Sequence, residues 1–595
     1  MASPNIILFT IDALRASRTC IAGYERPTTP TFERLAKNAI VCSNAFARGA
    51  FSQPSVTELM TSTKAFDYGG YDNITSGRPP TLFDYFHGHG YHTVNLATET
   101  WITRYNGFKK SVDEEVMLYG LYAFPGNASI RIRNVLNQFE KNEISQENML
   151  HDVVPELQKC FDDTEDYCQH QMQNWGKLST DFPYSPLVQS GYDYKKIISL
   201  VAKHRRKLDA DNMAYIYKYL FPARAIKDTR PYWLVKEWYY MRKPLTLVRQ
   251  LLQVIASKFF LSVNPRVGRR LKHSIKNYPD AHSIANNLIS KVKNLTTGEL
   301  EKKPFFIWTH LQDCHSPYVS GSGARWHKDT LKYLKELGYT DEIDPTATFR
   351  LVPKDKKDAK DFSALYDAAV RSTDDAIGRV VDYLEEINEL ENTIICIHAD
   401  HGEELGDHGD WGHFFRLYDH NTHIPLILYR HGMKAKRVSG FSSLLDVAPS
   451  LAFEAGLEPH PDWQGQKLQD SNAGQRAFEV LETFFGGSCL FDHRPLYMAA
   501  RNHEYMYMWN EYPDPGDFFH PEQHELYDLN KDPEQQNNIY RPDHPVIESL
   551  QRMIAERLAE IPEISNQRII DAFASVGAKV VLEYRDPDLE TVKSS

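Results

Sequence analysis

Paired cysteines and a recognisable leader segment are both missing from this sequence. Its seven cysteines are an odd number and contain no Cys-x-x-Cys pair, which argues against a disulfide framework and for reduced thiols. The first apolar run, residues 5–11, is too short to span a bilayer, and no basic region or cleavage site precedes it. We therefore expect a cytoplasmic protein.

Internal repeats, low-complexity tracts and a strong charge excess are also missing. The formal net charge of -11 is modest for 595 residues, which argues against a halophilic surface and a general nucleic-acid binder. Hydrophobic residues make up 42% and charged residues 25%, as in ordinary globular proteins. The length is sufficient for a large core and more than one domain.

The residues that suggest chemistry gather in residues 394–427. Ile394 to Ile397 form a short β-branched run that is typical of a buried strand. Asp400 and His401 follow at its carboxyl end, where open α/β sheets bind their ligands. A carboxylate and an imidazole suit a divalent cation, and Gly402 permits the backbone to turn sharply after them.

The first apolar run provides a partner for this site. Residues 5–11 are typical of a buried parallel strand, and that strand ends on Asp12. If the two strands lie side by side, Asp12 and Asp400 can bind one metal ion. Capping of the next segment is the alternative for Asp12 alone. The two carboxylates, with His408 and His413 further along the second loop, favour a metal site over a solvated surface loop.

Ser52 is the candidate nucleophile. Ser55 and Glu58 have the spacing of a capping box, which predicts a helix that begins at this point. Ser52 would then lie at the positive end of the helix. There an oxygen nucleophile is stabilised by the helix terminus, and by a metal ion if one is near.

Several segments occur together in an order that is known from one family. They are residues 5–15, 52–55, 366–371 with 374 and 377–378, 399–406, 424–427, 445–451 and 525–533. Together they resemble the sulfatase family, which belongs to the alkaline phosphatase superfamily. The resemblance covers both ends and most of the second half of the chain, whereas the middle has no counterpart.

The resemblance implies a doubly wound mixed α/β sheet flanked by helices, and a hydrolase with one divalent cation (Ca, Mg, Mn or Zn). The implied metal ligands are Asp12, Ser52, Asp400 and His401. Ser52 occupies the position where sulfatases carry a Cys or Ser that is oxidised to formylglycine. His315 matches the family's His before Pro-Tyr, and His413 stands where many members have a Lys. Both would contact the ester group, so Ser52, His315 and His413 are the implied catalytic residues.

Further substrate contacts are expected after two other strands. His310 and Asp313 come after the predicted strand 305–309 and are expected to contact the substrate. As an alternative, these two residues would bind a second metal ion. Thr98 and Glu99 lie near the family's Gly-Lys-Trp-His segment, which supplies cationic sulfate contacts in many members.

Two departures from the family keep the substrate open. Val56 replaces the Arg four residues after the nucleophile, which argues against formylglycine formation, and Thr98 and Glu99 replace cationic residues. The first hypothesis is a sulfate ester hydrolase. The second is a phosphomonoester or phosphodiester hydrolase, or a phosphotransferase, that uses unmodified Ser52. The third is an inactive binding protein that retains the fold.

Three regions are expected along the chain. Residues 1–115 and 303–456 would form the catalytic core, 116–302 a helical, partly basic insertion, and 457–595 a small α+β subdomain. Residues 195–276 contain 20 Lys and Arg against 4 Asp and Glu. This segment is either a lid with a solvated basic face or a peripheral membrane contact. The expected substrate is a small-molecule, glycan or lipid-head-group ester, and no nucleic acid partner is expected.

Overall fold

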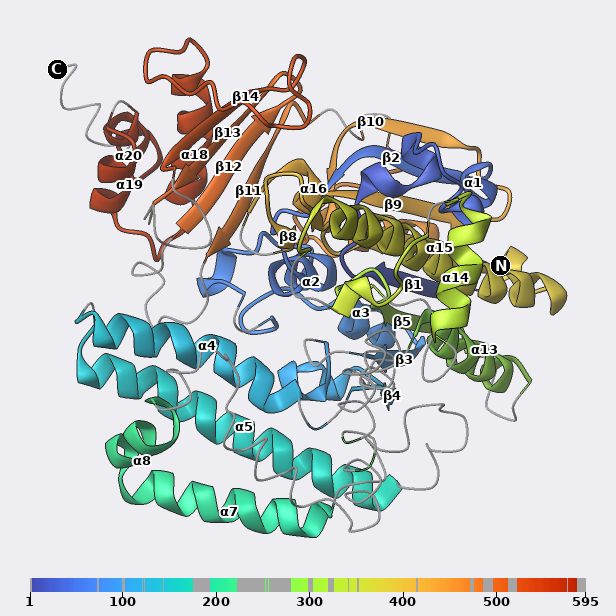
Figure 1. Cartoon of the computed structure of the whole chain (residues 1–595), viewed down its shortest axis with the longest axis horizontal. Helices are drawn as coiled ribbons and strands as arrows, with labels where there is room; N and C mark the ends of the chain where they lie inside the picture. Colours follow the sequence, from blue (N-terminus) through green and yellow to red (C-terminus); the bar gives the residue numbers. More distant parts are fainter. Residues whose placement is uncertain are drawn as a thin grey trace.

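Strand β1 (Asn5–Ile11) runs through the middle of an eight-stranded sheet (Figure 1). All seven of its residues are buried, which is usual for a continuous apolar strand that is covered on both faces. It pairs in parallel with β5 (Phe305–Leu311) on one side and with β6 (Thr393–Ala399) on the other. The two strands that the sequence predicts to carry the metal site are therefore neighbours.

The computed structural model describes residues 3–71, 74–98, 102–119, 121, 123–142, 144–174, 193–221, 252, 255, 280–297, 303–318, 326–340, 342–349, 353–413, 416–470, 473, 476–484, 496–511, 522–574 and 576–585. Two parts of the sequence-based predictions lie outside this range. They are Glu99 and, within the basic segment 195–276, residues 222–251, 253–254 and 256–276.

The remaining strands make the sheet a mixed one. They are β2 (Ala39–Phe46), β3 (His92–Ala97), β4 (Glu114–Met117), β9 (His423–Arg430) and β10 (Lys436–Ser443). The strand order is β10-β2-β9-β6-β1-β5-β3-β4. Strand β9 is antiparallel to β6 and β2, whereas the other neighbours in the sheet are parallel.

Helices flank the sheet and share one apolar core with it. The long helix α15 (Lys356–Glu386) packs against α1 (Pro30–Ala36), α13 (Ala281–Thr297) and α14 (Trp326–Glu336). A second group contains α2 (Ser52–Thr61), which contacts α3 (Leu82–Gly88) and α17 (Val447–Glu454). The predicted fold, a mixed sheet flanked by helices, is confirmed.

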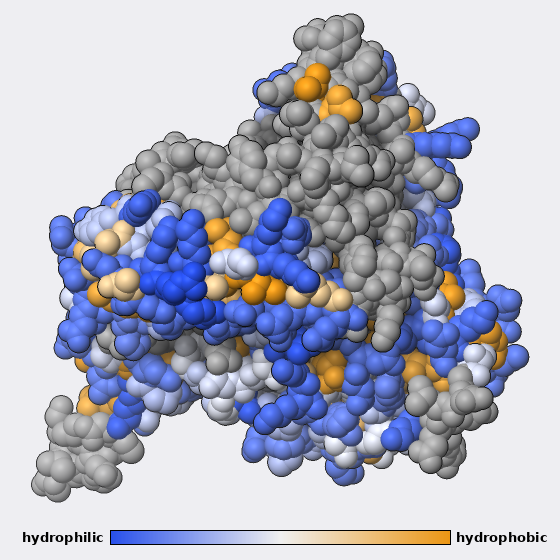
Figure 2. All heavy atoms as spheres, turned by 90° about the horizontal axis from the view of Figure 1, so that it is seen from below, coloured by the Kyte–Doolittle hydropathy of each residue, from blue (hydrophilic) through white to orange (hydrophobic). Residues whose placement is uncertain are grey.

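The described part of the middle region is helical. It contains α4 (Ala123–Glu140), α5 (Gln146–Asn174), α7 (Tyr194–Ala210) and α8 (Asn212–Tyr219). These helices lie beside one another below the sheet in Figure 1 and enclose an apolar cluster of their own. The described residues on the face seen in Figure 2 are mostly hydrophilic, with apolar residues in small groups. That distribution is typical of a solvated face, and the membrane contact stays a prediction.

A second sheet follows the eight-stranded sheet in the chain. Its four antiparallel strands are β11 (Phe478–Phe484), β12 (Leu496–Asn502), β13 (Tyr505–Asn510) and β14 (His524–Asp528). Helices α18 (Ile547–Ala559), α19 (Asn566–Ala572) and α20 (Gly577–Arg585) complete this α+β subdomain around a separate apolar cluster. Among the helices that the structure describes, none is both long enough and apolar enough to span a bilayer.

Candidate metal centre and nucleophile

The central strands bring acids and histidines to one edge of the sheet. Ile11, at the end of β1, is paired with Leu311 of β5 and with Ala399 of β6. The N–H of Asp12 donates to the carbonyl of Leu311 at 2.8 Å, and the N–H of Asp400 donates to the carbonyl of Ile11 at 3.3 Å. This register places Asp12 and Asp400 side by side at the carboxyl ends of parallel strands.

Asp12, Asp400 and His401 form a compact buried group, with ligand atoms within 4.8 Å of one another. The Nε2 atom of His401 lies 3.3 Å from Asp12 Oδ1 and 3.7 Å from Asp400 Oδ2. Nδ1 of His401 lies 2.8 Å from the carbonyl oxygen of Gly402 and donates to it, so the lone pair of Nε2 faces the carboxylates. Such a hydrogen bond commonly orients a histidine that binds a metal ion.

The unpaired oxygens of this group fit a cation. Asp400 Oδ1 accepts from the N–H groups of Ala13 (3.2 Å) and His401 (2.9 Å). Asp400 Oδ2 and Asp12 Oδ1 are buried and have no hydrogen-bond partner among the described residues. Burial raises the pKa of Asp12, but the nearby histidines, His315 first, outweigh it and hold that pKa below its usual range. Two ionised carboxylates and one imidazole suit a hard or borderline divalent cation.

His310 lies against the same two carboxylates. Its Nε2 atom is 3.5 Å from Asp400 Oδ2 and 3.8 Å from Asp12 Oδ2. Its Nδ1 atom is 3.4 Å from Thr98 Oγ1, and the Thr98 hydroxyl donates to the carbonyl of His310 at 3.1 Å. His310 can therefore supply a fourth ligand to a cation between the carboxylates. A substrate contact by His310 or Thr98 stays a prediction.

Asp313 has partners within the fold. Oδ1 accepts from the N–H of Ala281, the first residue of α13, at 2.8 Å. Oδ2 accepts from the hydroxyl of Ser372 at 3.3 Å. Burial, with the charge of Asp280, raises the pKa of Asp313 well above its usual range. These contacts give Asp313 a role in anchoring α13, and its predicted contact with substrate or a second metal stays untested.

Ser52 is the first residue of α2, and its Oγ lies 3.4 Å from His401 Nε2. The predicted capping box is wrong, because the helix already begins at Ser52. The hydroxyl of Ser55 instead donates to the carbonyl of Phe51 at 3.1 Å, inside the first turns. Glu58 is buried, and its Oε1 lies 3.6 Å from Nε of Arg48. Glu58 therefore pairs with Arg48 and does not cap the helix. The helix terminus therefore lies at the hydroxyl that was predicted to react.

His315 and His413 lie beside His401, next to the two carboxylates. The ring centroid of His413 lies 4.1 Å from that of His401 and 4.8 Å from that of His315. Burial lowers the pKa of His315, but Asp12 and Glu403 outweigh it and raise that pKa above its usual value. Burial, and then the charge of His401, lowers the pKa of His413. The two imidazoles therefore favour different protonation states, as an acid and a base do.

The structure adds two residues to the predicted site. Glu403 accepts from the hydroxyl of Tyr318 at 2.7 Å and lies 2.6 Å from Nδ1 of His413. The hydroxyl of Tyr366 donates to the carbonyl of Ala13 at 2.7 Å, which holds the loop after Asp12 in place. Both residues lie in segments that carry the family resemblance, and this resemblance is the sequence feature that could have identified them.

Comparisons with known proteins identify the family of the chain. The family model for Sulfatase matches residues 4–166 and 223–457. Arylsulfatase K of Mus musculus is 25% identical over 269 residues, which are 40% of this chain and 46% of that protein. N-acetylglucosamine-6-O-sulfatase of Bacteroides thetaiotaomicron is 31% identical over 184 residues, 29% of this chain and 31% of the relative. The chain thus spans less than half the length of these curated relatives.

A solved structure supports the same fold. It is a protein of Bacteroides thetaiotaomicron, described with the metabolism of multiple glycosaminoglycans. It superimposes with a TM-score of 0.55 and 15% sequence identity, over 96% of this chain and 99% of the other.

Proposed function

Since the chain belongs to the sulfatase family, we propose that it hydrolyses a sulfate ester with the help of one divalent cation. The observation that carries this proposal is the position of the Ser52 hydroxyl. It lies at the start of α2 and 3.4 Å from His401, beside two ionised carboxylates. A nucleophile, a candidate metal group and two further histidines around one point suit attack on a tetrahedral sulfur or phosphorus centre.

We assign metal binding and proton donation to different residues according to their positions. Asp12, Asp400 and His401 would hold the cation, with His310 and Ser52 beside them. A bound cation would polarise the ester and lower the pKa of the nucleophile. His315, which matches the family's His before Pro-Tyr, would protonate the departing oxygen.

The substrate we propose is a small sulfated molecule or a sulfated glycan. One relative acts on N-acetylglucosamine 6-O-sulfate by its name, and the similarity to it is the support for a carbohydrate substrate. A phosphate ester is the second candidate. Val56, buried in α2, stands where the family's modification motif has an Arg, and an unmodified serine is the nucleophile of phosphatases in the superfamily.

The test is a side-by-side assay of the purified chain. Aryl sulfate, aryl phosphate and an aryl phosphodiester are each supplied with Ca²⁺, Mg²⁺, Mn²⁺ or Zn²⁺. Turnover of the sulfate that depends on metal and is lost in Ser52→Ala supports the proposal. Turnover of phosphate esters alone favours the second candidate. No turnover above the Ser52→Ala variant for any ester would favour an inactive binding protein.

A further inference from the structure

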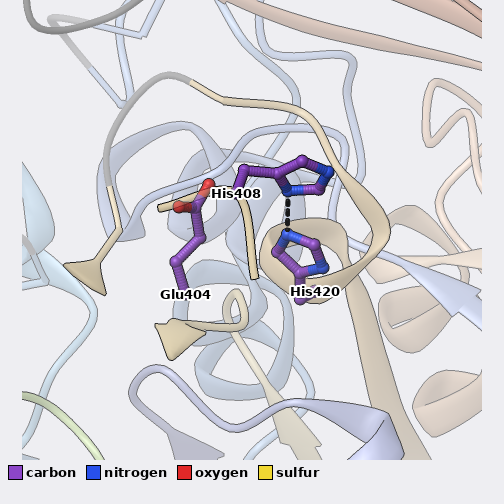
Figure 3. A group of neighbouring side chains, drawn as sticks. All are labelled: Glu404, His408 and His420. Carbon is purple, nitrogen blue, oxygen red and sulfur yellow. Dashed lines mark hydrogen bonds between the residues drawn. The ribbon is translucent and has the colours of Figure 1, made fainter. Parts of the chain in front are cut away.

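The loop after β6 contains a second group of metal-binding residue types. Glu404 lies in the short strand β7 (Glu404–Leu405), and His420 lies in the short helix α16 (Asp419–Thr422). His408 lies between them in the sequence. The ligand atoms of the three residues are within 4.8 Å of one another. Figure 3 shows the two imidazoles facing each other, with the carboxylate of Glu404 beside them. None of the three belongs to the catalytic group.

His408 is held in the orientation of a metal ligand. Its Nε2 atom lies 2.7 Å from the carbonyl oxygen of Gln535 and donates to it. Its ring stacks on Tyr418, with centroids 3.7 Å apart and an interplanar angle of 11°. The bare Nδ1 atom therefore points into the group, 2.9 Å from Nε2 of His420. A backbone carbonyl in this role is the usual outer partner of a metal-binding histidine.

Glu404 supplies a carboxylate oxygen that the fold leaves without a hydrogen bond. Its side chain is 2% exposed, and Oε1 accepts from the side-chain amide of Asn421 at 3.4 Å. Oε2 is buried and has no hydrogen-bond partner among the described residues. Oε2 does form an ion pair with Arg416, whose Nη1 lies 3.6 Å from it and whose Nη2 is paired with Asp410.

Other acidic side chains around the group are paired with arginines. Three acid–arginine pairs surround it: Arg15 with Asp407, Arg416 with Asp410, and Arg501 with Asp419. The guanidinium of Arg416 is shared between Asp410 and Glu404, and its Nη1 lies 3.6 Å from Oε2 of Glu404. A divalent cation between the two imidazoles and Glu404 would add a direct partner for that carboxylate.

We propose that Glu404, His408 and His420 bind a second metal ion, of the borderline class to which Zn²⁺ belongs. Two imidazole nitrogens and one carboxylate oxygen are a donor set that Zn²⁺ prefers over Ca²⁺ or Mg²⁺. When the ion binds, the proton on Nε2 of His420 moves to Nδ1 of the same ring, and two metal–nitrogen bonds replace the hydrogen bond between the imidazoles. Because His408 is also tied to Gln535, this ion links the loop that follows β6 to the segment after β14. It would stabilise the loop that carries Glu403.

The experiment counts zinc in a chain that lacks the catalytic metal group. In the D12A/D400A background, dialysed with Zn²⁺ and measured by elemental analysis, we expect one Zn²⁺ per chain. Adding E404Q or H420Q should remove it. H431Q is the matched control, because His431 is exposed and lies 3.7 Å from Glu391, and it should leave the zinc content unchanged. Co²⁺ in the same background should give visible absorption bands that are lost in E404Q.

Two results would overturn the proposal. One is a background variant without stoichiometric zinc. The other is zinc that both E404Q and H420Q retain. Circular dichroism melts of all variants detect loss of folding. E404Q keeps the size of the side chain and its contact with Asn421, so it decides the question if H420Q does not fold.

Discussion

Glu403 is buried and His413 is half-buried, and Oε2 of Glu403 lies 2.6 Å from Nδ1 of the imidazole. The contact assigns the proton of the imidazole to Nδ1, and Nε2 then carries the lone pair. The side-chain partners of Glu403 among the described residues are Tyr318 and His413, so we regard Glu403 as a positioning residue for His413.

Glu403→Gln should reduce kcat with little change in KM. The amide keeps the shape but no longer stabilises a charged imidazole, and loss of such a partner commonly costs about 10- to 100-fold. The pH profile of kcat should shift as well, since a merely structural role would not move it. Tyr318→Phe removes the other partner of Glu403 and should have the smaller effect. Equal effects in the two variants would contradict the positioning role.

Asp400→Ala should release one equivalent of metal and abolish turnover. Asp400 Oδ2 is buried and has no hydrogen-bond partner among the described residues, so the substitution breaks the ligand group. It also removes the two backbone contacts of Oδ1, and a circular dichroism melt therefore checks that the variant is folded. Elemental analysis is done in an E404Q background, where the proposed second site does not contribute. Metal content that stays at the level of the E404Q parent would show that Asp400 is not a ligand.

Ser52→Ala should lower the rate by about 10³-fold or more, as the loss of a covalent nucleophile usually does. Mass spectrometry of the peptide that contains residue 52 is expected to find an unmodified serine, because Val56 replaces the Arg of the modification motif. Oxidation to formylglycine removes two hydrogens and is therefore visible directly. A formylglycine would exclude the phosphate ester alternative.

Glu482→Gln should destabilise the C-terminal subdomain by about 2 kcal/mol, because Arg557 loses a buried, two-point ion pair. Glu482 contacts the guanidinium of Arg557 at 2.7 and 3.0 Å. Burial raises the pKa of Glu482, but Arg557 outweighs it and lowers that pKa to about 2. The pair therefore stabilises the native state fully above pH 4.5, and the contribution is lost as the pH falls from 4.5 towards 2.

Chemical denaturation at several pH values measures this effect. Glu583→Gln, which breaks the exposed pair with Arg552, is the control and should change the stability little. A Glu482→Gln variant with wild-type stability, or with the same dependence on acid pH, would contradict the prediction.

Local sequence was enough to predict the two central strands and the acids that follow them. The apolar composition of residues 5–11 and 394–397 is enough to predict that both are buried strands. Ligand-binding residues in α/β sheets follow the carboxyl ends of strands, which is where Asp12 and Asp400 stand. The start of α2 was predicted four residues too late, with Ser55 as the N-cap in place of Phe51. The spacing of Ser55 and Glu58 fits a cap, but Glu58 pairs with Arg48 in the folded chain.

The tertiary structure alone decided which distant residues meet. β1 pairs with β6 across nearly four hundred residues of chain, and His310, Glu403 and the carbonyl of Gln535 acquire their roles only through such pairings. Periodicity and composition report how a segment is buried, because burial depends on its own side chains. They do not report its neighbour, since that choice depends on the packing energy of the whole chain.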